Sequence, residues 1–157
     1  MMKTNIGISE SNAQKVATLL NVLLADEYIL YTKTRNYHWN VVGSNFQELH
    51  KFFENQYDQL DGAIDNIAER VRALGHWSLG SLKEFIKIAR LSEDEEASGK
   101  EAMIQNLLND HETLIRLLRE DIAATTDKYE DVGTADFLTG LMEAHEKMAW
   151  MLRAYIS

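Results

Sequence analysis

The 157-residue sequence contains no cysteine and no proline. Without cysteine the chain can form no disulfide, thiolate zinc site, iron–sulfur cluster or thiol nucleophile. Any transition metal must therefore be held by His, Asp or Glu. Without proline, long helices can run uninterrupted, and glycine and capping residues become the main signals for where a helix begins and ends.

Long apolar runs are also missing. No window approaches the roughly 18 consecutive apolar residues of a membrane-spanning helix. The segment Met1 to Glu10 lacks the basic stretch followed by an apolar stretch that is typical of a signal peptide. We therefore expect a soluble, cytoplasmic protein that does not associate with a membrane.

Positive charge is scarce and dispersed. Lys and Arg total 16 against 25 Asp and Glu, which gives a formal net charge of −9. The basic residues are scattered among acidic ones, which argues against binding of a phosphate backbone as the main activity. Cations are the more natural small partners, although an acidic surface also simply keeps a protein soluble.

The hydrophobic residues, 45% of the chain, are enough for one good core, so we expect a single domain over residues 1–157, with residues 1–10 as a short flexible segment. Apolar residues at helical spacing predict four long helices. Ser and Thr residues place the helix starts near Ser11, Ser44, Ser98 and Thr134. The three serines are at capping-box spacing from a Gln or Glu. The second helix should continue through Arg72 and stop at Gly75.

The stretch between the second and third long helices, His76 to Leu91, predicts a short helix after Ser81 within a long connection. A long connection at this point allows the chain to cross from one end of a bundle to the other. The sequence therefore favours an all-α fold, a ferritin-like four-helix bundle with a short extra helix between helices 2 and 3.

One stretch of the second helix carries an unusual set of polar residues. His50, Glu54, Asp65 and Glu69 lie at roughly 0°, 40°, 60° and 100° around the helix axis, so they share one face. A solvated acidic face would explain the carboxylates alone. However, His50 adds a nitrogen ligand, and His38 lies at the end of the preceding helix. The set therefore offers the mixed nitrogen and oxygen ligands that iron accepts.

These residues cannot form one site within one chain. Glu54 and Asp65 are about 16 Å apart along the helix axis, and His50 and Glu69 about 28 Å. Two metals held by shared ligands lie roughly 4 Å apart. Antiparallel packing of the helix against its copy would place His38, His50 and Glu54 opposite Asp65 and Glu69 of the second chain, which gives two equivalent sites per dimer. Gly62, between the two half-sites, would allow close approach or is simply tolerated.

The same residues resemble the signature of the Dps family, the mini-ferritins. The likeness rests on His38-Trp39, the Gly-x-Asn-Phe turn that begins at Gly43, His50, an acid four residues later, and Asp65 within DNIAER. Weaker matches are the Ala-Asp-Phe-Leu run after Thr134 and Trp150. The match spans nearly the whole chain, and the intervals across helix and loop agree together.

The resemblance implies a hollow dodecamer that stores iron and oxidises Fe(II) to Fe(III) at ferroxidase sites between subunits, with hydrogen peroxide or dioxygen as oxidant. Carried over by position, His38, His50 and Glu54 are metal ligands from one subunit, and Asp65 and Glu69 from its two-fold mate. Glu54 stands where many members carry Asp, so its longer side chain should alter the metal spacing.

Other residues have a functional and a structural interpretation. In the functional interpretation, Trp39 is an electron donor during peroxide reduction. In the structural interpretation, it is an aromatic side chain packed at the dimer interface. Glu130, Asp131 and Asp136, together with Asp127, either line an acidic ion-entry pore of the cage or form an ordinary acidic turn at a helix start. His76, His111 and His145 lack such a carboxylate array and are expected to be surface or core histidines.

Two alternative functions remain open. A nucleoid protein that compacts DNA is the first, but the segment before Ser11 offers only Lys3 as a basic residue, so we expect DNA binding to be weak or absent. A degenerate helical module that binds no iron is the second, and the presence of all five ligand residues argues against it.

Overall fold

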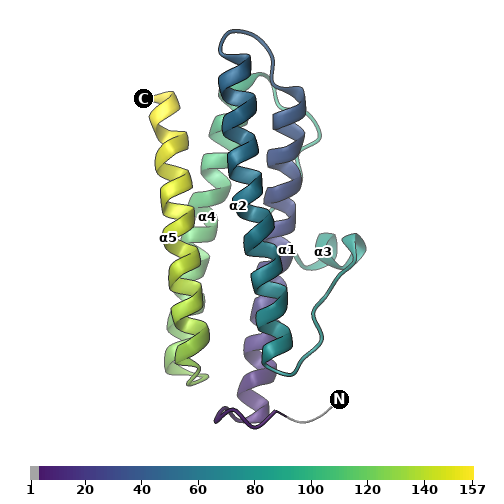
Figure 1. The fold of residues 1–157 in the computed structure, drawn as a ribbon, viewed down its shortest axis with the longest axis vertical. Helices are drawn as coiled ribbons and strands as arrows, with labels where there is room; N and C mark the ends of the chain where they lie inside the picture. The colour runs from purple at the N-terminus through teal and green to yellow at the C-terminus, as the bar shows by residue number, and fades with distance from the viewer. Residues whose placement is uncertain (1–3) are drawn as a thin grey trace.

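The computed structural model describes residues 4–157, which form five helices joined by loops (Figure 1). The helices are α1 (Glu10–Asn40), α2 (Phe46–Ala73), α3 (Leu82–Ile88), α4 (Lys100–Asp127) and α5 (Val132–Ile156). The all-α fold, the four long helices and the short helix between the second and third of them are confirmed.

The long helices are arranged as two antiparallel pairs. α1 packs mainly against α2, and α4 packs mainly against α5 (Figure 1). The connection between α2 and α4 returns the chain to the end of the bundle where α2 begins, and there Lys100 Nζ donates to the carbonyl of Ser44 at 3.1 Å. α4 therefore runs parallel to α2, as a crossover connection requires. α3 lies against α1, on the side away from α5.

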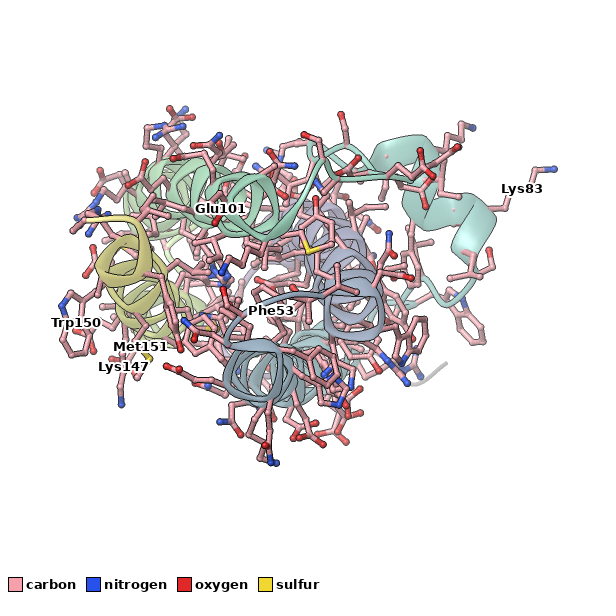
Figure 2. All side chains as sticks on the ribbon, turned by 90° about the horizontal axis from the view of Figure 1, so that it is seen from above. Phe53, Lys83, Glu101, Lys147, Trp150 and Met151 are labelled. Carbon is pink, nitrogen blue, oxygen red and sulfur yellow. The ribbon has the colours of Figure 1, made fainter. Side chains whose placement is uncertain are left out.

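A single cluster of apolar side chains fills the space between the long helices. Figure 2, viewed from above, shows Phe53 in the interior, whereas Lys147 and Trp150 lie at the outer edge of α5. Phe53, Leu20 and Leu114 are among the side chains with no exposed surface. Each such side chain contributes about 1.5–3 kcal/mol relative to an exposed one, so the bundle is held chiefly by this cluster.

Helices α1 and α2 begin at different residues from those predicted. α1 begins at Glu10, and Ser9 caps it by accepting a hydrogen bond from the Asn12 amide at 3.2 Å. α2 follows Asn45, whose φ of 63° is left-handed and whose side chain makes no capping bond. The predicted capping boxes at Ser11 and Ser44 are therefore wrong, since a cap must occupy the last non-helical position, which the incoming loop decides.

The other helix starts show the same effect. α4 follows Gly99, whose φ of 100° is left-handed and favours glycine, instead of being capped by Ser98. α5 begins at Val132, two residues before the predicted Thr134, because Asp131 caps it. Sequence spacing finds the region of a helix start, but neighbouring polar residues compete for the cap.

The connection before α4 is tied to the bundle by a buried carboxylate. Asp26 on α1 has no exposed surface and accepts hydrogen bonds from the backbone N–H of Arg90 and of Leu91 at 2.5 and 3.2 Å, and from Arg90 Nε at 2.7 Å. Three hydrogen bonds satisfy a carboxylate that would otherwise be costly to bury. The crossover segment is therefore held in one place against α1.

Part of the N-terminal segment also contacts the bundle. Ile8 packs against the core cluster, and Thr4 lies beside Gly75, where an added Cβ would approach the Thr4 side chain to 2.7 Å. Residues 1–3 of the predicted flexible segment lie outside the described residues. None of the helices within residues 4–157 has an apolar stretch long enough to cross a bilayer.

Candidate metal centre

His38 and His50 are brought together by the short loop between α1 and α2. His38 lies in the last turn of α1 and His50 near the start of α2. Their imidazole rings stack with centroids 3.7 Å apart and planes inclined by 19°. His38 is buried and His50 is half-buried. The predicted approach of the two histidines across the loop is confirmed.

Each ring is fixed by the backbone of the other histidine. His38 Nδ1 lies 2.7 Å from the His50 carbonyl oxygen, and His50 Nδ1 lies 2.8 Å from the His38 carbonyl oxygen. Because a carbonyl oxygen can only accept, both Nδ1 atoms must carry the proton. In the neutral ring Nε2 then keeps its lone pair and can bind a metal, as in metal sites whose His ligands donate the other N–H to a carbonyl.

Glu54 lies one turn beyond His50 on α2 and is half-buried. The ammonium group of Lys51 donates to Glu54 Oε2 at 2.6 Å. This hydrogen bond is the main reason that the pKa of Glu54 lies below its usual value, with a smaller contribution from the nearby His38 and His50. Glu54 is therefore an ionised carboxylate, and a metal cation would have to displace Lys51 in order to bind it.

Asp65 and Glu69 lie farther along α2 and are exposed. Asp65 borders an open hollow of about 450 Å³ between α1, α2 and α3, which Tyr28, Gly62 and Phe85 also line. Within residues 4–157, no three His, Asp or Glu side chains converge closely enough to hold a metal. The helix thus separates the predicted ligands into two groups on one chain, and their union across two chains stays a prediction.

Gly62, between the two groups, is exposed, and beyond the backbone of its own helix no atom of residues 4–157 lies within 4 Å of a Cβ added there. No contact within these residues requires a glycine at this position. Its use for close approach of a second chain stays a prediction.

A cation held among aromatic rings borders His38, and the sequence did not indicate it. The Arg35 guanidinium carbon lies 5.5, 5.0 and 5.2 Å from the ring centroids of Tyr31, Trp39 and Tyr57. The Tyr57 ring stands edge-on to the His38 ring at 5.2 Å. Arg35 thereby orders the aromatic side chains beside the histidine pair. Only the spacing of four between Tyr31 and Arg35 could have suggested the cluster.

Comparison with known proteins agrees with the fold and this pattern of residues. The model of the ferritin-like domain family matches residues 17–157. A DNA protection during starvation protein of Brevibacillus brevis is 36% identical over 157 residues, covering 99% of both chains. The chain belongs to the Dps family.

Further relatives extend this result. An uncharacterised low temperature-induced protein of Nostoc sp. is 48% identical over 157 residues, 99% of this chain and 88% of the relative. The crystal structure of the Dps protein of Vibrio cholerae O1, described as a member of a broad superfamily of ferritin-like diiron-carboxylate proteins, superposes with a TM-score of 0.93. It shares 32% identity over 100% of this chain and 99% of that one.

The acidic residues predicted to line a pore divide into two kinds. Asp131 is 2% exposed. It accepts from the Thr134 amide at 2.9 Å, from the Thr134 hydroxyl at 2.5 Å, and from Arg70 Nη2 at 3.3 Å. The structural interpretation therefore holds for Asp131, which caps α5 and presents no carboxylate to solvent. Glu130 and Asp136 are exposed, and their place in a pore stays a prediction.

Trp39 is exposed and His76 is half-buried, whereas His111 and His145 lie in the core. Trp39 is 63% exposed in the single subunit, which leaves it free to meet a second chain or an oxidant. His76 is half-buried, 3.7 Å from Glu10. His111 and His145 are core histidines, as expected, but they are bonded to each other at 2.9 Å. This pairing was not foreseen, because 34 residues separate them in sequence.

Proposed function

We propose that twelve copies of this chain assemble into a hollow cytoplasmic cage, which oxidises Fe(II) at sites shared by two subunits and stores the ferric product. This proposal depends mainly on the fixed pair of His38 and His50, whose Nε2 atoms are both left for a metal. The α2 face that carries His50 also bears Asp65 and Glu69, which are too distant to join the pair. Membership of the Dps family and the diiron-carboxylate description of the Vibrio cholerae neighbour support iron as the substrate.

The two halves of each proposed site have complementary chemistry. His38, His50 and Glu54 come from one subunit, and Asp65 and Glu69 come from its two-fold mate. Neutral imidazoles bind Fe(II) without adding negative charge, whereas carboxylates favour the Fe(III) that is formed. A site with few anionic ligands binds the substrate and still allows the ferric ion to leave for the cavity.

The proposed reaction consumes iron and peroxide together. Two Fe(II) ions each lose one electron, and hydrogen peroxide with two protons accepts both electrons to give two water molecules. Because both electrons reach the peroxide at one site, no hydroxyl radical is released. Dioxygen is the alternative oxidant. Removal of iron and peroxide in this way would protect the cell from oxidative stress.

The test combines one substitution in each half-site, His38→Ala with Glu69→Ala. Stopped-flow absorbance would follow Fe(II) oxidation with hydrogen peroxide and, separately, with dioxygen, on protein whose size matches a dodecamer. We expect rapid oxidation to be lost while the cage stays assembled. His76→Ala is the matched control and should oxidise iron at the wild-type rate. Wild-type rates in the double variant would refute the proposed site.

Binding and compaction of DNA is the alternative function, and the name of the Brevibacillus brevis relative, DNA protection during starvation protein, favours it. Two surface arginines argue against a basic binding face, because Arg119 and Arg153 are paired with Glu146 and Glu112 at 2.5 and 2.7 Å. A gel-shift assay at low salt separates the functions. We expect no retardation of DNA, and strong retardation would favour the alternative.

A further inference from the structure

Three ionisable side chains form a hydrogen-bonded chain inside the bundle. Glu27 on α1, His145 on α5 and His111 on α4 have no exposed surface. Glu27 Oε1 lies 2.7 Å from His145 Nε2, and His145 Nδ1 lies 2.9 Å from His111 Nδ1. The other polar atoms, Glu27 Oε2 and His111 Nε2, have no hydrogen-bond partner among residues 4–157. The cluster is therefore shielded from bulk solvent, and no further polar group of residues 4–157 joins it.

The two hydrogen bonds limit how many protons the cluster can hold. The ionised Glu27 accepts, so His145 Nε2 carries a proton. In the Nδ1–Nδ1 hydrogen bond only one of the two nitrogens can carry the proton. With both hydrogen bonds intact and Glu27 ionised, the cluster can hold at most three protons, two on His145 and one on His111, and its net charge is then zero. A fourth proton on His111 would place two N–H groups face to face and break that bond.

The other buried ionisable side chains of the five helices are already paired, so none of them is available to balance a fourth proton. On α1, the other buried acid is Asp26, which binds Arg90 at 2.7 Å, and the buried Lys33 binds Asp110 of α4 at 2.7 Å. The remaining buried ionisable groups of α1, Tyr37 and His38, are bonded to Asp94 and to the His50 carbonyl. α2 and α3 bury no ionisable side chain, and α4 and α5 bury only His111 and His145.

We propose that Glu27, His145 and His111 form an acid-sensitive latch, which joins α1, α4 and α5 while it holds no more than three protons and opens when acid supplies a fourth. An uncompensated buried charge is strongly destabilising, so the fourth proton is accommodated only when the helices separate and expose it to solvent. This inference does not depend on the proposed iron chemistry, because the cluster lies outside the candidate metal centre.

Burial sets the direction of the effect. The pKa of His111 lies well below the ordinary 6.5, first because burial disfavours its charge and second because His145 is close. A histidine with a lowered folded-state pKa stabilises the fold above its unfolded-state pKa, and this stability is lost as the pH falls below that value. Because His111 stays neutral in the closed protein and has the ordinary pKa of 6.5 in the open one, its contribution shifts the opening equilibrium roughly 25-fold between pH 7 and pH 5.

The test compares wild-type protein with His111→Asn, whose amide can donate or accept at the Nδ1 position but does not titrate. Hydrogen–deuterium exchange of the assembled protein would be measured for peptides of α4 and α5 at pH 7 and pH 5. Comparison at one pH removes the intrinsic pH dependence of exchange. We expect wild-type exchange, relative to His111→Asn, to rise roughly 25-fold at the lower pH. His76→Asn is the control and should keep the wild-type pH dependence.

A second measurement reads the protonation of the ring nitrogens directly. Solid-state ¹⁵N spectra of histidine-labelled, assembled protein report which ring nitrogens carry protons. We expect one histidine to stay neutral from pH 7 to pH 5 while the fold remains closed, and His111→Asn identifies its signals as those of His111. The proposal is overturned if His111 becomes doubly protonated in the closed protein, or if the ratio of wild-type to His111→Asn exchange is equal at both pH values.

Discussion

The division of the proposed metal site between two chains can be tested by complementation. One variant loses the imidazole half through His38→Ala and His50→Ala. The other loses the acid half through Asp65→Asn and Glu69→Gln. Cages made of either variant alone should lack every complete site, because each site needs one half from each chain. Mixed cages should regain activity, because a dimer of the two variants contains one site with both halves intact.

The expected magnitude follows from the geometry of α2. At 1.5 Å per residue, Glu54 lies about 16 Å from Asp65 along the axis, so no chain can complete its own site. In cages built from equal amounts of both variants with random pairing, half of the dimers are mixed. Each mixed dimer has one complete and one empty site, so about a quarter of all sites should be active.

The assay is stopped-flow Fe(II) oxidation on co-expressed, differently tagged chains. Native mass spectrometry would establish that each cage contains both variants and twelve subunits. The fast phase should have an amplitude of about a quarter of that of the wild type, and neither single-variant cage should show this phase. Absence of the fast phase from mixed cages of confirmed composition would refute the shared site, as would a fast phase in either single-variant cage.

Three further predictions concern single side chains. Lys51→Gln removes the ammonium group that competes for Glu54, so Fe(II) should bind more tightly, by less than about fivefold, in a titration at low salt; unchanged affinity would contradict this role. Asp131→Ala removes the cap of α5 and should lower stability by about 1–2 kcal/mol in chemical denaturation, without slowing iron uptake. Asp136→Asn should do the reverse, slowing uptake at limiting iron without loss of stability, and an unchanged uptake rate would remove Asp136 from the pore.

Two of these variants have a matched control elsewhere in the chain. Lys83 is exposed on α3, and Lys83→Gln should leave Fe(II) affinity unchanged (Figure 2). Asp127 is exposed at the end of α4, and Asp127→Ala should cost much less stability than Asp131→Ala, because Asp127 caps no helix. A stability loss of equal size in both Asp variants would show that charge, and not capping, is responsible.

The helices were predictable from the sequence because their signal is repeated many times. Leu20, Leu24 and further apolar residues recur at helical spacing, and absence of proline removes the strongest interruption. The helix starts were less predictable, since each depends on one residue. Ser9 and Ser11 are both good caps, and only the path of the preceding loop decides between them.

The candidate metal centre was predictable where it depends on helix geometry. His50 and Glu54 are one turn apart, and the short loop brings His38 to His50, so their proximity follows from local structure. The ring orientations were not predictable, because they depend on hydrogen bonds from each Nδ1 to the other residue's carbonyl. The contact of Lys51 with Glu54 is likewise a matter of side-chain conformation.

The sequence by itself determined the all-α fold, the spacing of ligand types along α2, and the impossibility of a complete site in one chain, because all three follow from the period and rise of a helix. Only the tertiary structure decided which distant residues meet. It buried Asp131 as a cap, surrounded Arg35 with aromatic rings, and joined Glu27 to His145 and His111. Contacts between residues as far apart as Glu27 and His145 depend on how the helices pack, and no local pattern encodes them.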